Sequence, residues 1–149
     1  MIRNLGKVFL ALCFLTVGGG AVANAQIDRD SRIEANVPFA FVVVNTTLPA
    51  GKYEIKWIDG NSPTVLEIRS YNGRRAVIFD TDVKRTPNDE PANKTELIFN
   101  KIGDKYFLSQ IWADGDVNGN QLEKSKTEKS LEGDGTQTER HSIAAIRKR

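Results

Sequence analysis

The sequence predicts an all-β fold, a small antiparallel sandwich or barrel of six to seven strands. Apolar and polar residues alternate with a period of two in several short runs, which is typical of strands with one buried face. Turn-forming residues separate these runs at intervals of about 8–12 residues, and little helical periodicity precedes residue 120. A chain of 149 residues is long enough for one such domain and its core.

The first 25 residues have the pattern of a secretory signal peptide. Arg3 and Lys7 make the start positive, an apolar run covers residues 8–17, and the segment ends in Ala23-Asn24-Ala25, which signal peptidase accepts. We therefore expect cleavage after Ala25 and an exported protein, either periplasmic or secreted. The apolar run is about half of the roughly 20 residues that span a bilayer, so no stable membrane anchor is expected after cleavage.

Cleavage changes the charge and the cysteine content. The chain has 21 Lys and Arg against 19 Asp and Glu, and the loss of Arg3 and Lys7 leaves 19 of each sign. A mature chain without net charge argues against a nucleic-acid partner. The only cysteine, Cys13, lies in the removed segment, so neither a disulfide nor a cysteine-ligated metal is expected.

The first strands are predicted on both sides of a proline-glycine turn. Residues 33–44 (IEANVPFAFVVV) alternate between apolar and polar positions. Pro38 within them has no amide proton, so this strand should begin near Pro38 or run along an edge. Residues 48–51 (LPAG) have Pro and Gly at positions that favour a turn. Residues 52–58 (KYEIKWI) alternate cleanly and form the next predicted strand.

Two hairpins are predicted next. Residues 64–70 and 74–82 flank Asn72-Gly73, which favours a type I′ turn because both of its central positions need positive φ. A polar loop that contains two prolines separates this hairpin from a second one. The second hairpin pairs residues 94–101 with residues 105–112.

The C-terminal part is more polar than the rest. Residues 121–131 (QLEKSKTEKSL) suit a short polar helix or a last edge strand, since their only apolar residues are two leucines. Residues 132–149 contain glycine, threonine and many charges, and we expect a disordered tail there. The β domain is therefore expected to cover residues 33–131.

No catalytic constellation is evident in the sequence. The single histidine, His141, falls in the expected tail, and neither a nucleophile motif nor a phosphate-binding loop is present. The residues therefore predict no cofactor and a non-enzymatic protein. The alternative is a small envelope hydrolase that uses paired carboxylates in a barrel mouth. Its candidate residues, chosen for their positions at strand ends or nearby loops, are Glu67, Asp80, Asp82 and Glu96.

One loop has the start of a calcium-binding pattern. Asp114, Asp116 and Asn118 stand at positions 1, 3 and 5, and a glycine follows, as in D-x-D-x-N-G loops. Position 12, where a bidentate glutamate belongs, is Ser125. The alternative is a solvated turn in which Asp, Asn and Gly adopt left-handed backbone conformations.

Aromatic and basic residues offer further candidate sites. Trp57 and Trp112 would bind carbohydrate or a partner if their rings were exposed, but each lies in an alternating strand where it could equally face the core. Arg74 and Arg75 beside the Asn-Gly turn, with Arg69 nearby, form either a small basic spot or a solvated hairpin tip.

Five segments form a recurring pattern of strand starts and turns: Val37-Pro38-Phe39-Ala40-Phe41, Leu48-Pro49-Ala50-Gly51-Lys52-Tyr53, Leu97-Ile98-Phe99, Gly103-Asp104-Lys105-Tyr106-Phe107-Leu108 and Ile111-Trp112. Together they resemble a group of small exported β proteins of unknown function, of acidobacterial type. The resemblance covers residues 33–131 and implies an exported bacterial β domain. Its motifs are strand starts and turns, so it implies no catalytic residue, and the loop at Asp114 lies outside its pattern.

These observations lead to one expected function. The chain is predicted to be an exported, non-enzymatic β domain that binds an envelope protein or an envelope polysaccharide. The residues leave the choice of ligand, the oligomeric state and the order of the strands open.

Overall fold

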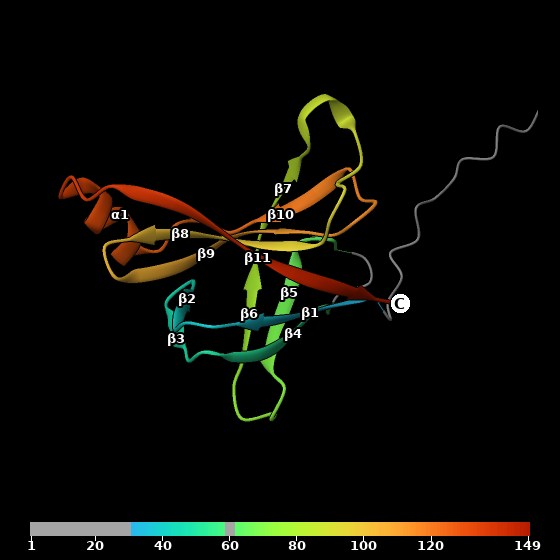
Figure 1. Ribbon diagram of the computed structural model, residues 1–149, viewed down its shortest axis with the longest axis horizontal. Helices are drawn as coiled ribbons and strands as arrows, with labels where there is room; N and C mark the ends of the chain where they lie inside the picture. Colours follow the sequence, from blue (N-terminus) through green and yellow to red (C-terminus); the bar gives the residue numbers. More distant parts are fainter. Residues whose placement is uncertain (1–30, 59–61) are drawn as a thin grey trace, which may run out of the picture.

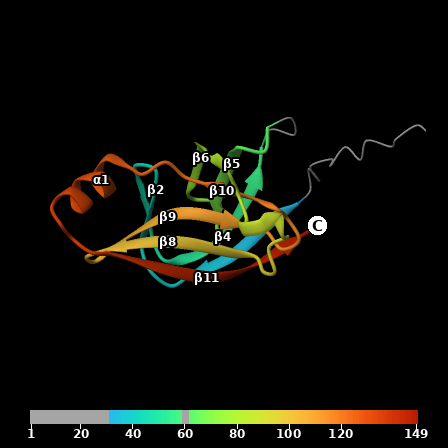
Figure 2. The ribbon, with the colours of Figure 1, turned by 90° about the horizontal axis from the view of Figure 1, so that it is seen from above.

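A computed structural model describes residues 31–58 and 62–149, where eleven strands surround a core and one α-helix lies at one end (Figures 1 and 2). The predicted signal peptide lies outside these residues. No helix that the structure describes is long and apolar enough to cross a bilayer. The elements are β1 (Arg32–Val37), β2 (Phe41–Val43), β3 (Thr46–Leu48), β4 (Gly51–Trp57), β5 (Val65–Ser70), β6 (Ala76–Asp80), β7 (Asp82–Arg85), a 3₁₀ turn (Pro87–Asp89), β8 (Glu96–Ile102), β9 (Lys105–Trp112), β10 (Asn118–Gln121), α1 (Lys126–Gly133) and β11 (Thr138–Lys148).

All the strands belong to one sheet that curls into a nearly closed barrel. Its main path runs β3-β2-β9-β8-β11-β1-β4-β5-β6, and its neighbours are antiparallel except for β2 and β9. The sheet nearly closes through two short strands. β6 continues through Thr81 into β7, β7 pairs with β10, and β10 pairs with β9, which lies near the start of the path. In Figure 1 the β5–β6 hairpin crosses the direction of β8 and β9 steeply, as a strongly twisted sheet requires.

The all-β prediction is confirmed, but the expected number of six to seven strands is wrong. Two predicted strands are each divided: Pro38 ends β1 and separates it from β2, and Thr81 separates β6 from β7. The missing amide proton of Pro38 explains the first break. Three further strands, β3, β10 and β11, are short or polar, so their sequences lack a clear apolar alternation.

The central strands lie close to their predicted positions, since β4, β5, β8 and β9 differ by at most two residues from the expected ranges. The turn between β5 and β6 differs from the predicted type. Gly73 has a φ of 71°, but Asn72 is not among the residues with positive φ. A four-residue loop therefore connects Ser70 to Arg75, whose backbones are hydrogen-bonded to each other, in place of a two-residue type I′ turn.

The core fills the inside of the curled sheet. Its aromatic centre is Phe41, which meets Tyr53 and Phe99 edge-on at centroid distances of 5.1 and 5.4 Å. Aliphatic residues from β1, β4, β5, β8 and β9 surround these rings, and all of them are buried. The alternation expected for residues 52–58 is confirmed, with Tyr53 and Ile55 buried and the side chains between them partly or fully exposed.

The expected disordered tail is instead the longest strand. β11 runs from the α1 end of the molecule to the opposite end (Figure 2). Its first part pairs with β8, where Ile143 lies opposite Leu97, and its last part pairs with β1, where Ala145 lies opposite Ala35. The β domain therefore extends beyond residue 131. Backbone hydrogen bonds and a few small apolar residues hold this strand, so its composition alone looks like that of a tail.

Helix α1 confirms the predicted short polar helix and lies against β8. The Ser125 hydroxyl accepts a hydrogen bond from the Glu128 backbone amide and thereby caps the helix. The Glu128 side chain is buried, and its carboxylate accepts a hydrogen bond from Asn100 Nδ2 of β8 at 2.7 Å. Burial raises the pKa of the Glu128 carboxyl, although its hydrogen bonds with Asn100 and the Ser125 backbone oppose this rise.

A shortened chain tests the role of β11. Ending the chain at residue 137 removes all pairing with β8 and β1, so we expect loss of the cooperative unfolding transition in thermal and urea unfolding followed by circular dichroism. The matched control omits only Arg149, which lies outside β11, and should unfold like the complete chain. Cooperative unfolding without β11 would contradict this assignment.

The buried carboxyl of Glu128 predicts a pH-dependent stability. A carboxyl group whose pKa is higher in the folded than in the unfolded protein lowers the free energy of unfolding as the pH rises above its unfolded pKa, near 4.5. Below that pH the group is protonated in both states, and this destabilisation is absent. Glu128→Gln should therefore gain stability relative to the native chain as pH rises from about 4 to about 8, as measured by urea unfolding. The control Glu123→Gln should show a weak opposite trend, because a hydrogen bond from Lys129 lowers the pKa of the exposed Glu123.

Candidate functional site

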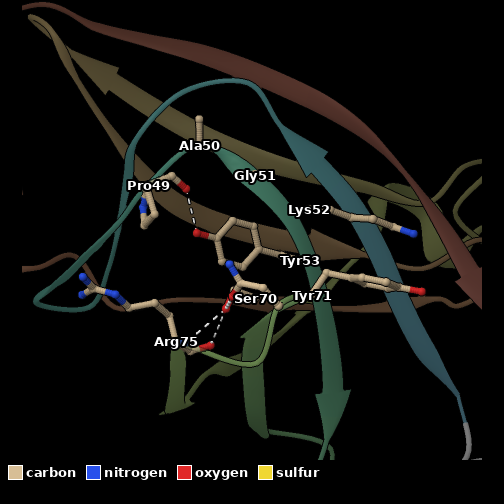
Figure 3. A pocket seen from close by; sticks show the side chains of 9 residues that line it. Pro49, Ala50, Gly51, Lys52, Tyr53, Ser70, Tyr71 and Arg75 are labelled. Atoms are coloured by element: carbon tan, nitrogen blue, oxygen red, sulfur yellow. Dashed lines mark hydrogen bonds between the residues drawn. The ribbon is translucent and has the colours of Figure 1, made fainter.

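An open pocket of about 320 Å³ lies between the turn that precedes β4 and the β5–β6 hairpin (Figure 3). We call it the hairpin pocket. One wall is the Pro49–Tyr53 segment, which leads from the turn into β4. The other wall comes from the hairpin. The complete lining is Pro49, Ala50, Gly51, Lys52, Tyr53, Ser70, Tyr71, Asn72 and Arg75.

An exposed aromatic ring stands on one side of the pocket. Tyr71 is 64% exposed, and the Lys52 ammonium lies 4.0 Å from the centre of its ring. The register of β4 and β5 produces this pair, because the Tyr71 backbone amide donates to the Lys52 carbonyl at 2.9 Å. Lys52 also forms an ion pair with Glu34 of β1 at 3.2 Å. Ring, ammonium and carboxylate therefore lie in one short row.

A second cation extends on the other side of the pocket. In Figure 3 the Arg75 side chain points away from Lys52, beside Pro49. Arg75 forms no ion pair within residues 31–58 and 62–149. Between the two cations lies Tyr53, which is 1% exposed and whose hydroxyl donates to the Pro49 carbonyl at 2.7 Å. Burial raises the pKa of Tyr53, and the charge of Arg75 partly opposes this rise.

A buried serine fixes the conformation of the hairpin. The Ser70 hydroxyl donates to Asn72 Oδ1 at 2.8 Å and accepts from the Arg75 backbone amide at 2.9 Å. Asn72 Oδ1 also accepts from the Arg74 amide, so the loop is closed by its own polar side chains. The positions of Tyr71 and Arg75 are therefore set by the hairpin itself and by its pairing with β4.

A second pocket of about 300 Å³ lies beside the start of β9. The β2–β3 hairpin, the β8–β9 turn and Thr127 of α1 line it. Its charged residues, Asp104 and Lys105, have opposite signs. Of its two aromatic residues, Phe41 is buried, and Tyr106 is half-buried and stacked on Phe39 at 3.8 Å between ring centres. This pocket therefore offers a ligand no exposed ring of the kind that Tyr71 presents.

The candidate calcium residues lie around an arginine side chain. Nη1 of Arg147 donates to the Asp116 carboxylate at 2.8 Å and to the Asp114 carbonyl at 3.1 Å. Nε of the same guanidinium donates to the Ser31 hydroxyl at 2.9 Å. Asn118 lies at the start of β10, in register with Arg85. Among the described residues, no group of three His, Cys, Asp or Glu side chains is placed to hold a metal ion.

The two tryptophans of the sequence analysis are not exposed platforms. Trp112 is 7% exposed, and its indole Nε1 donates to Gln110 Oε1 at 3.1 Å. The ring lies so close to Gly119 that a Cβ there would be 2.5 Å from Trp112 Cε3, so only glycine fits at that position. Trp57 is half-buried and packs against the core. Trp112 therefore faces the core, which is one of the two alternatives that its alternating strand left open, and its ring fills the space over Gly119.

The four carboxylates of the hydrolase alternative are not gathered in one pocket. Glu96 on β8 and Glu67 on β5 are separated by β11, β1 and β4, which places them about 19 Å apart along the sheet. Glu67 pairs with Arg69 at 2.6 Å, and Glu96 pairs with Lys94 at 2.8 Å. The remaining two, Asp80 and Asp82, are exposed. None of the four lines either pocket.

The only histidine is an exposed residue of β11. His141 meets Phe39 and Tyr106 edge-on, at centroid distances of 5.4 and 5.6 Å. These neighbours are aromatic rings, so His141 extends the aromatic cluster of Phe39 and Tyr106. The sequence predicts His141 in a disordered tail, whereas the structure places it in β11.

The site contains residues that sequence reasoning did not select. Tyr71 was overlooked because it follows the predicted strand and looks like a loop residue. Arg75 was considered with Arg69 and Arg74, but only Arg75 lines the pocket, and Arg69 pairs with Glu67. Pairing of consecutive strands would have been a usable signal, since the pairing of residues 52–58 with 64–70 brings Tyr71 beside Lys52.

Loss of the Arg147 side chain should loosen the loop at Asp114. Arg147→Ala removes bonds to Asp116, the Asp114 carbonyl and Ser31, so we expect a loss of about 1–2 kcal/mol in the free energy of unfolding. Lys148→Ala, at the exposed next position, is the control and should change stability little.

The same melting experiment tests the calcium hypothesis. Because Arg147 already neutralises Asp116, we expect calcium to leave the melting temperature of the native protein unchanged. A rise that a chelator reverses would contradict this expectation and would identify Asp114, Asp116 and Asn118 as ligands.

Comparisons with known proteins add no assignment, since no family model, curated protein or solved structure matches this chain. The candidate site therefore rests on the geometry of the hairpin pocket.

Proposed function

We propose that this chain is an exported, non-enzymatic β domain that binds an anionic polysaccharide of the cell envelope in the hairpin pocket. The observation that carries the proposal is the combination of Tyr71, whose ring is largely exposed, with the cation Arg75 at the other side of the same pocket, which forms no ion pair with any described residue. The Lys52 ammonium lies above the ring, and its charge is paired with Glu34.

The chemistry of these groups favours an acidic sugar. A guanidinium binds a carboxylate through two parallel hydrogen bonds, and a tyrosine ring packs against the apolar face of a sugar. Asn72, which lines the pocket, carries a side-chain amide that can donate to a hydroxyl group. A volume of about 320 Å³ lies at the lower end of the range for small-ligand sites, so one sugar unit of a longer polymer would fit.

The hydrolase alternative has less support. Glycoside hydrolysis needs two carboxyl groups within about 5–9.5 Å on either side of the bond that breaks. Glu67 and Asp80 are diagonal neighbours on the outer face of β5 and β6, but Glu67 pairs with Arg69 and Asp80 is exposed. Neither lies in a pocket that would exclude water, so binding without catalysis is the better proposal.

Binding of short oligosaccharides tests this function. We expect a galacturonate trimer to bind, as measured by calorimetry, and a neutral galactose trimer of the same length to bind much more weakly. Arg75→Ala and Tyr71→Ala should each weaken binding about tenfold, the effect of losing one charged hydrogen bond or one ring contact. The affinity should also fall as salt concentration rises.

The matched control is Arg69→Ala, which removes an exposed cation of the same hairpin that pairs with Glu67 and lies outside the pocket. It should leave the affinity unchanged. Equal binding of the charged and neutral trimers, or an equal loss in all three variants, would exclude the hairpin pocket as a site for acidic sugars.

A further inference from the structure

Three cations lie in one row across neighbouring strands of the sheet. Arg32 of β1 lies directly opposite Lys148 of β11 on one side and directly opposite Lys56 of β4 on the other. All three residues are exposed on the outer face of the sheet, since residues next to them along the strands, such as Ile33 and Ile55, are buried in the core. Neighbouring strands are about 4.8 Å apart, so these three residues, which we call the cation row, span about 10 Å.

The next row along the same strands has the opposite charge. Glu34 of β1 and Glu54 of β4 lie directly opposite each other. Like charges in directly opposite positions destabilise a sheet, whereas opposite charges in the same positions stabilise it. In directly opposite positions the charges of this face therefore work against the pairing of the strands. Their arrangement instead presents a line of positive charge on the surface.

The cations of the row lie further out than the carboxylates beside them. Arg32 and Lys56 share the carboxylate of Glu54, at distances of 3.4 and 2.6 Å. The Glu54 side chain is 19% exposed, against 44% for Arg32 and 47% for Lys56. Lys148 forms no ion pair within residues 31–58 and 62–149. An anion that approaches this face therefore meets guanidinium and ammonium groups first.

Lys52 connects the cation row with the hairpin pocket. It lines the pocket, and its ammonium pairs with Glu34 of β1 at 3.2 Å. Lys52 and the row supply four positive charges against the two negative charges of Glu34 and Glu54, so two positive charges stay unbalanced on this part of the face. Along β4, Lys52 and Lys56 are four residues apart, which corresponds to about 13 Å. A polymer held in the pocket therefore lies within reach of the row.

We infer that an acidic polysaccharide held in the hairpin pocket also binds the cation row, where its carboxylates contact Lys56, Arg32 and Lys148. The inference rests on the proposed function and extends the same site to longer chains. The polymer runs from β4 toward β11, because the residue that continues the row on β5 is Glu67, whose charge would repel it. Two contacts with one chain raise its affinity without any change in the pocket.

Galacturonate oligomers of two lengths test the role of the row. A trimer occupies the pocket alone, whereas a dodecamer is long enough to contact both places. A dodecamer also contains about ten overlapping trimers, so in the native protein it should bind clearly more than about tenfold tighter than the trimer. Calorimetry in about 0.1 M salt suits this comparison, because charge interactions are screened there beyond about 10 Å and a trimer in the pocket does not sense the far end of the row.

Reversal of one charge in the row separates the two contacts. Lys148→Glu should weaken binding of the dodecamer at least about fivefold and leave the affinity for the trimer unchanged. The variant breaks no ion pair within the described ranges 31–58 and 62–149. It should not lower the melting temperature, because a glutamate opposite Arg32 replaces a repulsive pair with an attractive one.

The matched control is Lys126→Glu, which makes the same change of charge on helix α1, at the other end of the molecule (Figure 2). It should bind both oligomers like the native protein, since Lys126 lies outside the pocket and the row. Brief acetylation followed by mass spectrometry gives a second readout. The dodecamer should protect Lys56 and Lys148 from the reagent, and the trimer should protect neither.

Two results would overturn the inference and leave the proposed function in place. The first is a dodecamer that binds no more than about tenfold tighter than the trimer to the native protein. The second is an equal effect of Lys148→Glu and Lys126→Glu on the dodecamer. A trimer that does not bind at all is a different result, since it contradicts the hairpin pocket itself and removes the inference together with the proposed function.

Discussion

The pairing of β11 with both β8 and β1 is the interaction on which the rest of the structure depends. It joins the strands on the β8–β9 side to those on the β4–β5 side, and without it the sheet would have two further open edges. Backbone hydrogen bonds supply most of this connection. Arg147 strengthens its end by binding Ser31 and the loop at Asp114, so the last strand, the first strand and a distant loop are held at one point.

The strands that were predictable have a strong apolar alternation, and those that were missed have a different source of stability. The KYEIKWI segment of β4 places Tyr53 and Ile55 in the core, so its pattern and its burial agree. β11 has three half-buried residues on one face, Ile143, Ala145 and Arg147, and only the first two are apolar, while its neighbours β8 and β1 carry the fully buried core residues. A strand between two others can be polar, since its amides are satisfied on both sides. Local composition cannot reveal that situation.

The candidate site depends on long-range placement in a similar way. A local motif at Asp114 and Asp116 indicated a cation, and the fold brings one there, but it is Arg147 from the other end of the chain. The tryptophans were the candidates for an exposed ring, but Trp112 is buried against Gly119. The ring that lies exposed beside the pocket is Tyr71. Alternation identified the residues that build the core. It could not identify a residue in a loop that becomes a wall of a pocket only through pairing with β4.

The β5–β6 hairpin shows how a short polar loop becomes the wall of a pocket. Ser70 and Asn72 fix the loop, and Tyr71 and Arg75 line the pocket. Salt screens the attraction between an exposed guanidinium and an acidic chain, so the charge of Arg75 alone would hold such a chain weakly at physiological salt. Contact of an apolar sugar face with the Tyr71 ring is not screened in this way. The proposed site therefore needs the ring and the cation together, which the loop supplies by holding both on one hairpin.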